Sequence, residues 1–160
     1  MTQRISTIAA IGAALTFSAS PASALGVLAY GDEPVGDPGG VVQDLISTEF
    51  ERFFSAAGTV LVIHYDTVQL GMDRVCHATV GISAAPEAGA TARLPAWRFN
   101  ATRLIRNHGN VDVAGRRECL TSAIREAARN MMQVPIPELA TRSKASLVGA
   151  RNAKRAGRDI

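Results

Sequence analysis

The chain has 160 residues, a size that favours a single domain and excludes a large multidomain assembly. Hydrophobic residues make up 47% of the sequence and charged residues 19%, which excludes an intrinsically disordered protein dominated by charge. The net charge of +3 hides an asymmetry: residues 90–160 carry 14 Lys and Arg against 5 Asp and Glu, whereas residues 25–89 carry 2 against 9. Such an imbalance can steer a partner or bind an anionic surface, and a solvated arginine-rich surface would produce it equally well.

The first 24 residues have the organisation of a secretory signal peptide. Arg4 precedes an apolar run from Ile5 to Phe17, and the sequence Ala-Ser-Ala at 22–24 provides a small-residue cleavage site. The apolar run is shorter than the ~20 residues that span a bilayer, so we read it as a signal peptide and not as a membrane anchor. We therefore expect cleavage near Ala24, a periplasmic or secreted location, and no transmembrane span in the mature chain.

Export determines how the two cysteines, Cys76 and Cys119, are interpreted. Disulfides persist in oxidising compartments, and two cysteines allow only one pairing. We expect a bond that ties a central strand to the last helix and stabilises the fold by about 4 kcal/mol through loop closure. A redox pair or a metal site is the alternative, but the sequence lacks the C-x-x-C spacing typical of either.

The elements follow in chain order. Residues 25–40 are rich in Gly, Pro and Asp and predict a linker. Apolar residues at helical spacing predict a first helix over Val41–Ala57 and a second over Arg116–Met132, with Asp112 able to cap the second. Three segments show the β-branched composition or the alternation of strands: Thr59–Gln69, Arg74–Ser83 and Leu94–Arg106.

This order predicts an α+β domain over residues 41–140. We expect a small three-stranded antiparallel sheet with both helices packed on one face, in the order helix, three strands, helix. The disulfide supplements a modest core. Residues 141–160 are basic and rich in alanine, and we expect a flexible tail there that could contact an anionic surface.

Polar residues alternate with apolar ones along the second and third predicted strands, which predicts one solvent-exposed sheet face. We expect this face to bind another envelope or secreted protein. The candidate binding residues are His77, Thr79, Arg98, Asn100 and Thr102.

An enzymatic or metal-binding function is the main alternative. His64 and Asp66 are two residues apart and share a face, and His77 lies on the next predicted strand, so the three could hold zinc or act as acid and base. The sequence contains no H-E-x-x-H, no G-x-S-x-G and no Gly-rich phosphate loop. We therefore predict no catalytic residue and no cofactor. The element order also occurs in double-stranded-RNA-binding domains, but the export signal argues against nucleic acid as a partner.

The Cys-bearing strand, the Ala-rich helix around Glu118–Arg129 and the segment Val134-Pro-Ile-Pro137 resemble the C-terminal periplasmic domain of the TolA/TonB group. The resemblance spans residues 41–140 and implies an antiparallel sheet against helices that works by protein contact. This chain departs from that group in placing its first Cys on the second strand, in an insertion around Pro86, and in lacking a helical stalk. The resemblance implies an adaptor role and assigns no functional residue. A secreted inhibitor or immunity-type protein remains open, because it differs from an adaptor only in its partner.

Overall fold

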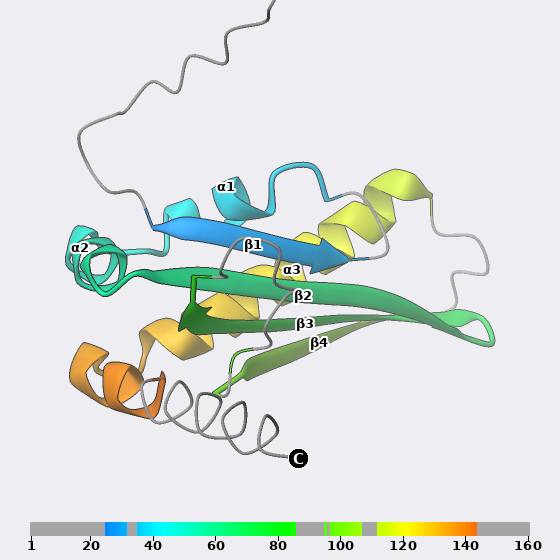
Figure 1. The fold of residues 1–160 in the computed structure, drawn as a ribbon. Coiled ribbons are helices and arrows are strands. Elements are labelled where there is room, and N and C mark those ends of the chain that lie inside the picture. Colours follow the sequence, from blue (N-terminus) through cyan, green and yellow to red (C-terminus); the bar gives the residue numbers. More distant parts are fainter. Residues whose placement is uncertain (1–24, 32–34, 86–94, 96, 107–111, 144–160) are drawn as a thin grey trace, which may run out of the picture.

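The computed structural model describes residues 25–31, 35–85, 95, 97–106 and 112–143 (Figure 1). The expected leader, the insertion around Pro86, and the part of the expected tail beyond residue 143 lie outside these described residues. Within the described part of the chain, no helix is long and apolar enough to cross a membrane.

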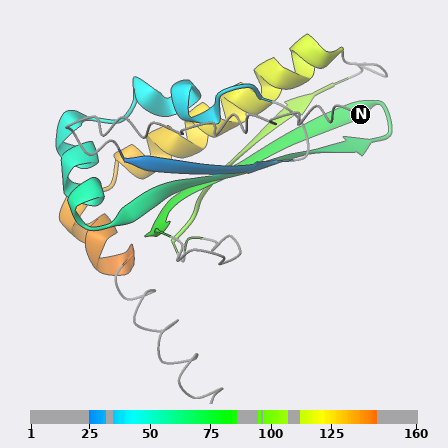
Figure 2. The same cartoon turned by 45° about the horizontal axis from the view of Figure 1, so that its top comes forward.

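A four-stranded sheet carries helices on one of its faces (Figures 1 and 2). The elements in chain order are β1 (Gly26–Gly31), α1 (Pro38–Gln43), α2 (Thr48–Ala56), β2 (Thr59–Leu70), β3 (Asp73–Ala84), β4 (Phe99–Ile105) and α3 (Val113–Met132). Residues 136–143 form a further helical segment. The strands lie in the order β1-β2-β3-β4; β1 runs parallel to β2, and the other pairs are antiparallel.

The α+β class, the helix-covered face and the disulfide are confirmed. The prediction of a three-stranded antiparallel sheet is wrong, because the sheet has four strands and one pairing is parallel. The missing strand is β1, which lies within the segment expected to be a linker. Its six residues include three small ones, and the breaker-rich sequence that follows obscured it. Gly31 allows the pairing, because a Cβ atom there would lie 2.1 Å from the ring of Tyr65.

The single helix expected over residues 41–57 is two helices. The backbone leaves the helical path after α1, and Ser47 starts α2 by accepting a hydrogen bond from the Phe50 amide at 3.1 Å.

The last strand begins later than expected, at Phe99, because Pro95 is fully buried against Gly81. The start of α3 is capped as expected, with Asp112 accepting from the Gly115 amide at 2.7 Å.

The core lies between the sheet and α3, which packs across β3 and β4. The strand residues that face α3 include Leu61, Ile63, Ala78 and Val80, all fully or nearly fully buried. From α3, Leu120, Ile124, Ala127 and Met131 fill the same layer. Small alanines on α3 let the helix approach the sheet closely, which suits a core with few aromatic residues.

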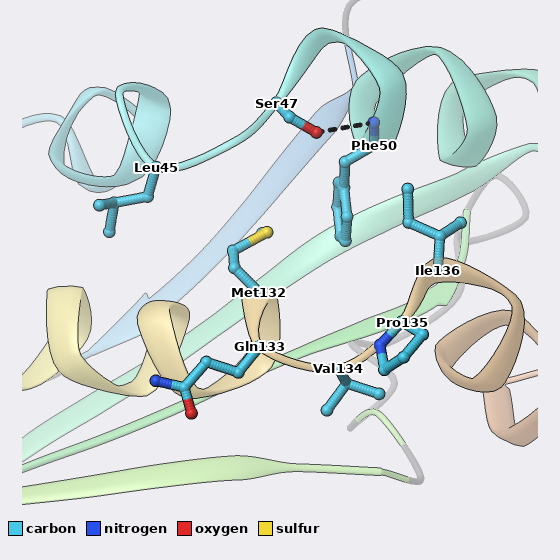
Figure 3. Close-up of a pocket in the computed structure, with 8 residues that line it drawn as sticks. All are labelled: Leu45, Ser47, Phe50, Met132, Gln133, Val134, Pro135 and Ile136. Atoms are coloured by element: carbon cyan, nitrogen blue, oxygen red, sulfur yellow. Dashed lines mark hydrogen bonds between the residues drawn. The ribbon is translucent and has the colours of Figure 1, made fainter.

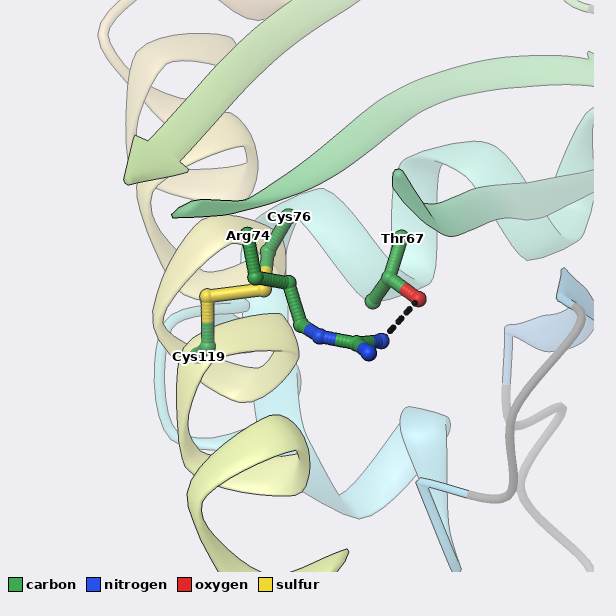
Figure 4. Close-up of a disulfide and its surroundings, with 4 residues drawn as sticks. All are labelled: Thr67, Arg74, Cys76 and Cys119. Carbon is green, nitrogen blue, oxygen red and sulfur yellow. Dashed lines mark hydrogen bonds between the residues drawn. A yellow bond between two sulfur atoms is a disulfide. The ribbon is translucent and has the colours of Figure 1, made fainter. Parts of the chain in front are cut away.

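The disulfide joins Cys76 on β3 to Cys119 in the first turns of α3, with 6.0 Å between the Cα atoms (Figure 4). Both cysteines are buried. Arg74, two residues before Cys76, donates a hydrogen bond from Nη1 to Thr67 Oγ1 at 3.1 Å. The Cys76–Cys119 disulfide therefore fixes α3 to the sheet and shows that Cys76 lies on the face of β3 that α3 covers.

A bidentate ion pair fixes the end of α1 to α3. The Arg125 guanidinium donates to both carboxylate oxygens of Asp44 at 2.7 Å and to the Val41 carbonyl at 2.8 Å. The hydrogen bonds from Arg125 hold the pKa of the Asp44 carboxyl below its ordinary value. The same contact raises the pKa of Arg125, which stays charged at every accessible pH.

This pair predicts a pH-dependent stability. A carboxyl whose pKa is lowered by folding stabilises the native state above its unfolded pKa of about 3.9, and that contribution is lost as the pH falls through the folded pKa. Asp44→Asn should therefore lower Tm at pH 7, and the difference from wild type should shrink progressively as acidification protonates the Asp44 carboxylate. Thermal unfolding followed by circular dichroism measures this. The control is Asp37→Asn, since Asp37 makes no side-chain capping bond to α1; a deficit that stays constant as the pH is lowered from 7 would contradict the assignment.

Candidate binding surface on the open sheet face

Side chains of successive strand residues point to opposite faces of the sheet. Because Cys76 bonds to α3, residues an odd number of positions from it on β3 point away from the helices. The strand register extends this assignment to the neighbouring strands. We call this surface the open face; Figure 2 shows no helix of the described chain covering it. It carries four of the five predicted binding residues: His77, Thr79, Asn100 and Thr102.

These four side chains form one hydrogen-bonded chain across β3 and β4. The Thr79 hydroxyl donates to Asn100 Oδ1 at 2.7 Å. His77 Nε2 lies 3.3 Å from Thr79 Oγ1, and His77 Nδ1 lies 3.2 Å from Thr102 Oγ1. Because the Thr79 hydroxyl has one proton and gives it to Asn100, its oxygen accepts from His77 Nε2–H. Neutral His77 then accepts from the Thr102 hydroxyl through Nδ1, and each hydroxyl in the chain is satisfied.

Arg98 is the fifth predicted residue, and it lies just before β4. Its Nε donates to the Pro95 carbonyl at 3.0 Å, while the residue as a whole is exposed. At the end of the sheet where β4 begins, four open-face residues are buried: Val60, Val62, Gly81 and Ser83. The open face is therefore closed to solvent at that end. The accessible part of the open face lies toward the β2–β3 turn.

The histidine and aspartate residues considered for metal binding also lie on the open face. His77 pairs directly with Asp66 across the sheet, and His64 pairs with Thr79. Among the described residues, no group of three His, Cys, Asp or Glu side chains is placed to hold a metal ion. Both ring nitrogens of His77 are engaged with threonines, which leaves neither as a ligand or base. No specific observation therefore favours the enzymatic alternative.

Sequence reasoning did not identify the apolar part of this surface. Three apolar residues are direct cross-strand neighbours on β2, β3 and β4: Val68, Val75 and Leu104. We call these three residues the apolar strip. Val68 is 48% exposed and Leu104 47%, and Val75 is half-buried between them. Leu70 and Met72 continue the exposed apolar surface to the turn. The signal was the persistence of apolar residues at alternate positions of β2 after Asp66, on the face that otherwise becomes polar.

Two cavities lie away from the open face. One of about 340 Å³ lies where the α1–α2 connection meets the end of α3, lined by Leu45, Ser47, Phe50, Met132, Gln133, Val134, Pro135 and Ile136 (Figure 3). None of its lining side chains titrates, and the Ser47 hydroxyl already caps α2. The second, of about 290 Å³, lies beside Leu25 and Val27 and includes Asp37 and Glu51 without a nucleophile or histidine. Neither lining provides a set of groups for acid–base or nucleophilic catalysis.

No family model matches the chain, and no curated protein or solved structure matches it.

Proposed function

We propose that this chain is an exported, non-catalytic adaptor of the bacterial cell envelope that binds another envelope or secreted protein through the open face. The observation that supports the proposal is the apolar strip, left exposed on the face opposite the helices. Contiguous exposed apolar side chains rimmed by polar groups are typical of protein interaction sites. Removing apolar surface from water contributes a favourable free energy of about 25 cal/mol per Å², so burial of the strip would favour association.

The polar chain beside the strip supports the same use. His77, Thr79 and Thr102 make their hydrogen bonds to one another and to Asn100, so a partner can cover them without leaving a hydroxyl unsatisfied. An apolar centre beside satisfied polar groups has the organisation of a protein interface.

Export is part of this proposal. The signal-peptide-like sequence before Leu25 motivates it, and the Cys76–Cys119 bond is of the kind that persists outside the cytoplasm. An inhibitor or immunity-type protein would use the same face, and it would differ only in the identity of the bound protein.

A pair of conservative substitutions tests the surface. Val68→Thr with Leu104→Thr places a β-branched residue, which strands favour, at both positions and puts a hydroxyl on each, so the fold should persist while the strip loses its apolar character. We expect capture of the partner from an envelope extract to fall at least tenfold, about 1.4 kcal/mol, a modest loss for a buried interface contact.

The control is Val113→Thr, which changes an equally exposed apolar residue (54% exposed) at the start of α3. It should leave capture unchanged. Equal capture by the strip variant and wild type would remove the open face as the binding surface.

A further inference from the structure

The charge on the open face differs from that of the chain as a whole. Although the second half of the sequence is strongly basic, the strands place no Lys or Arg side chain on this face; Arg74 and Arg103 lie on the opposite face, the side of α3. The charged side chains that the strands do place there are Asp66 on β2 and Asp73 on β3. Arg98 and Arg106 lie beyond the two ends of β4, and the register continues from Ile105 to place Arg106 next to Asp73. Asp66, by contrast, lies in register with His77 and Thr102.

Asp66 lies two residues from Val68, on the same strand and the same face, and therefore borders the apolar strip. Its carboxylate is half-buried, and its Oδ1 atom is buried without a hydrogen-bond partner among the described residues. His77, its cross-strand neighbour, already uses both ring nitrogens on threonines. A covered carboxylate oxygen without a donor destabilises the free protein, and a donor from outside would relieve that cost.

We infer that the partner presents a segment in which a Lys or Arg side chain is flanked by apolar side chains. In this arrangement the apolar side chains cover Val68, Val75 and Leu104, and the cationic group pairs with Asp66 where water is excluded. The inference rests on the proposed function and adds the chemical class of the bound segment. Charge complementarity carries it, because a cationic side chain would supply the donor that Asp66 Oδ1 lacks among the described residues, whereas an acidic segment would place a second negative charge beside Asp66.

Two measurable properties follow. Asp66→Asn preserves the shape of the side chain and removes its charge, so the affinity for such a segment should fall about tenfold at low ionic strength, as for an interfacial charge pair. Binding to wild type should also weaken with added salt, and the variant should show a smaller salt dependence, because screening acts only on the charge that remains. Glu118→Gln, an exposed acid on α3, is the matched control and should change neither.

The experiment uses the full disulfide-bonded chain, immobilised and offered a phage-displayed library of random peptides. The inference expects enriched peptides that carry Lys or Arg beside Val, Leu, Ile or Phe. Isothermal titration of the synthetic peptides should show about tenfold weaker binding to Asp66→Asn and to the Val68→Thr/Leu104→Thr variant, and unchanged binding to Glu118→Gln.

The outcomes separate the inference from the proposed function. The inference is overturned if the enriched peptides are neutral or acidic. It is also overturned if they bind Asp66→Asn as well as wild type but lose affinity for the strip variant. In both cases the assignment of the binding surface still stands. Peptides indifferent to both variants overturn both. Failure to enrich any peptide overturns the inference. A concentration-dependent dimer in sedimentation, abolished by the strip variant, would also overturn it by assigning the strip to a second copy of the chain.

Discussion

Removal of the disulfide is expected to lower the free energy of unfolding by about 4 kcal/mol, because the bond closes a loop with a sequence separation of 43 residues. In the unfolded chain that closure removes conformational entropy, and in the native state it holds α3 against β3. Cys76→Ala with Cys119→Ala tests this by guanidinium unfolding at pH 7. Two-state analysis is appropriate for a domain of this size.

The control for this prediction is chemical. Reductant should shift the unfolding midpoint of the wild-type protein toward that of the double variant, and it should have no effect on the double variant itself. A wild-type midpoint that does not respond to reductant under denaturing conditions would mean that the thiols are not bonded, and the argument for an oxidising compartment would lose its structural support.

Truncation of Phe54 is expected to have an effect of similar size. Phe54 is 1% exposed and packs against Phe50 with ring centroids 4.5 Å apart, beneath the start of β2. Phe54→Ala should cost about 3–5 kcal/mol through lost burial and a residual cavity. Urea unfolding measures the change.

Phe53 provides a matched control, because it is the same residue type in the same helix and is 41% exposed. Its ring contacts Phe54 only edge-on, at 5.2 Å between centroids. Phe53→Ala should therefore cost about 1 kcal/mol, the value of an exposed aromatic contact. Equal losses at the two positions would contradict the orientation of α2.

Where local pattern and tertiary packing agree, the sequence predicted the elements well. The sequence predicts β2 from its run of β-branched apolar residues, β3 from its alternation and α3 from its helical spacing of apolar residues. Strand β1 was missed because it is held by parallel pairing to β2 and by the fit of Tyr65 over Gly31, and neither is a local property of residues 26–31. The break between α1 and α2 depends on the Ser47 cap, which the continuous apolar spacing across that point concealed.

For the candidate surface, the alternation of polar and apolar residues predicts which side chains share a face of the sheet. It does not predict how neighbouring strands are aligned. The sequence placed His77, Thr79, Asn100 and Thr102 on one side, and the structure brings them into hydrogen-bonding distance. It could not show that Val68, Val75 and Leu104 align, because cross-strand neighbours are set by the pairing of distant segments. Nor could it show that Asp66 Oδ1 has no donor among the residues that the structure describes, since that depends on how His77 is engaged.

The most direct test of the open face is site-specific photo-crosslinking in the source cells. A photoreactive amino acid at position 104 would lie on the apolar strip, and one at position 113 would lie at the start of α3 with comparable exposure. The account predicts a covalent adduct with one protein from position 104 and none from position 113. Adducts from position 113 alone, or the same adducts from both positions, would contradict it.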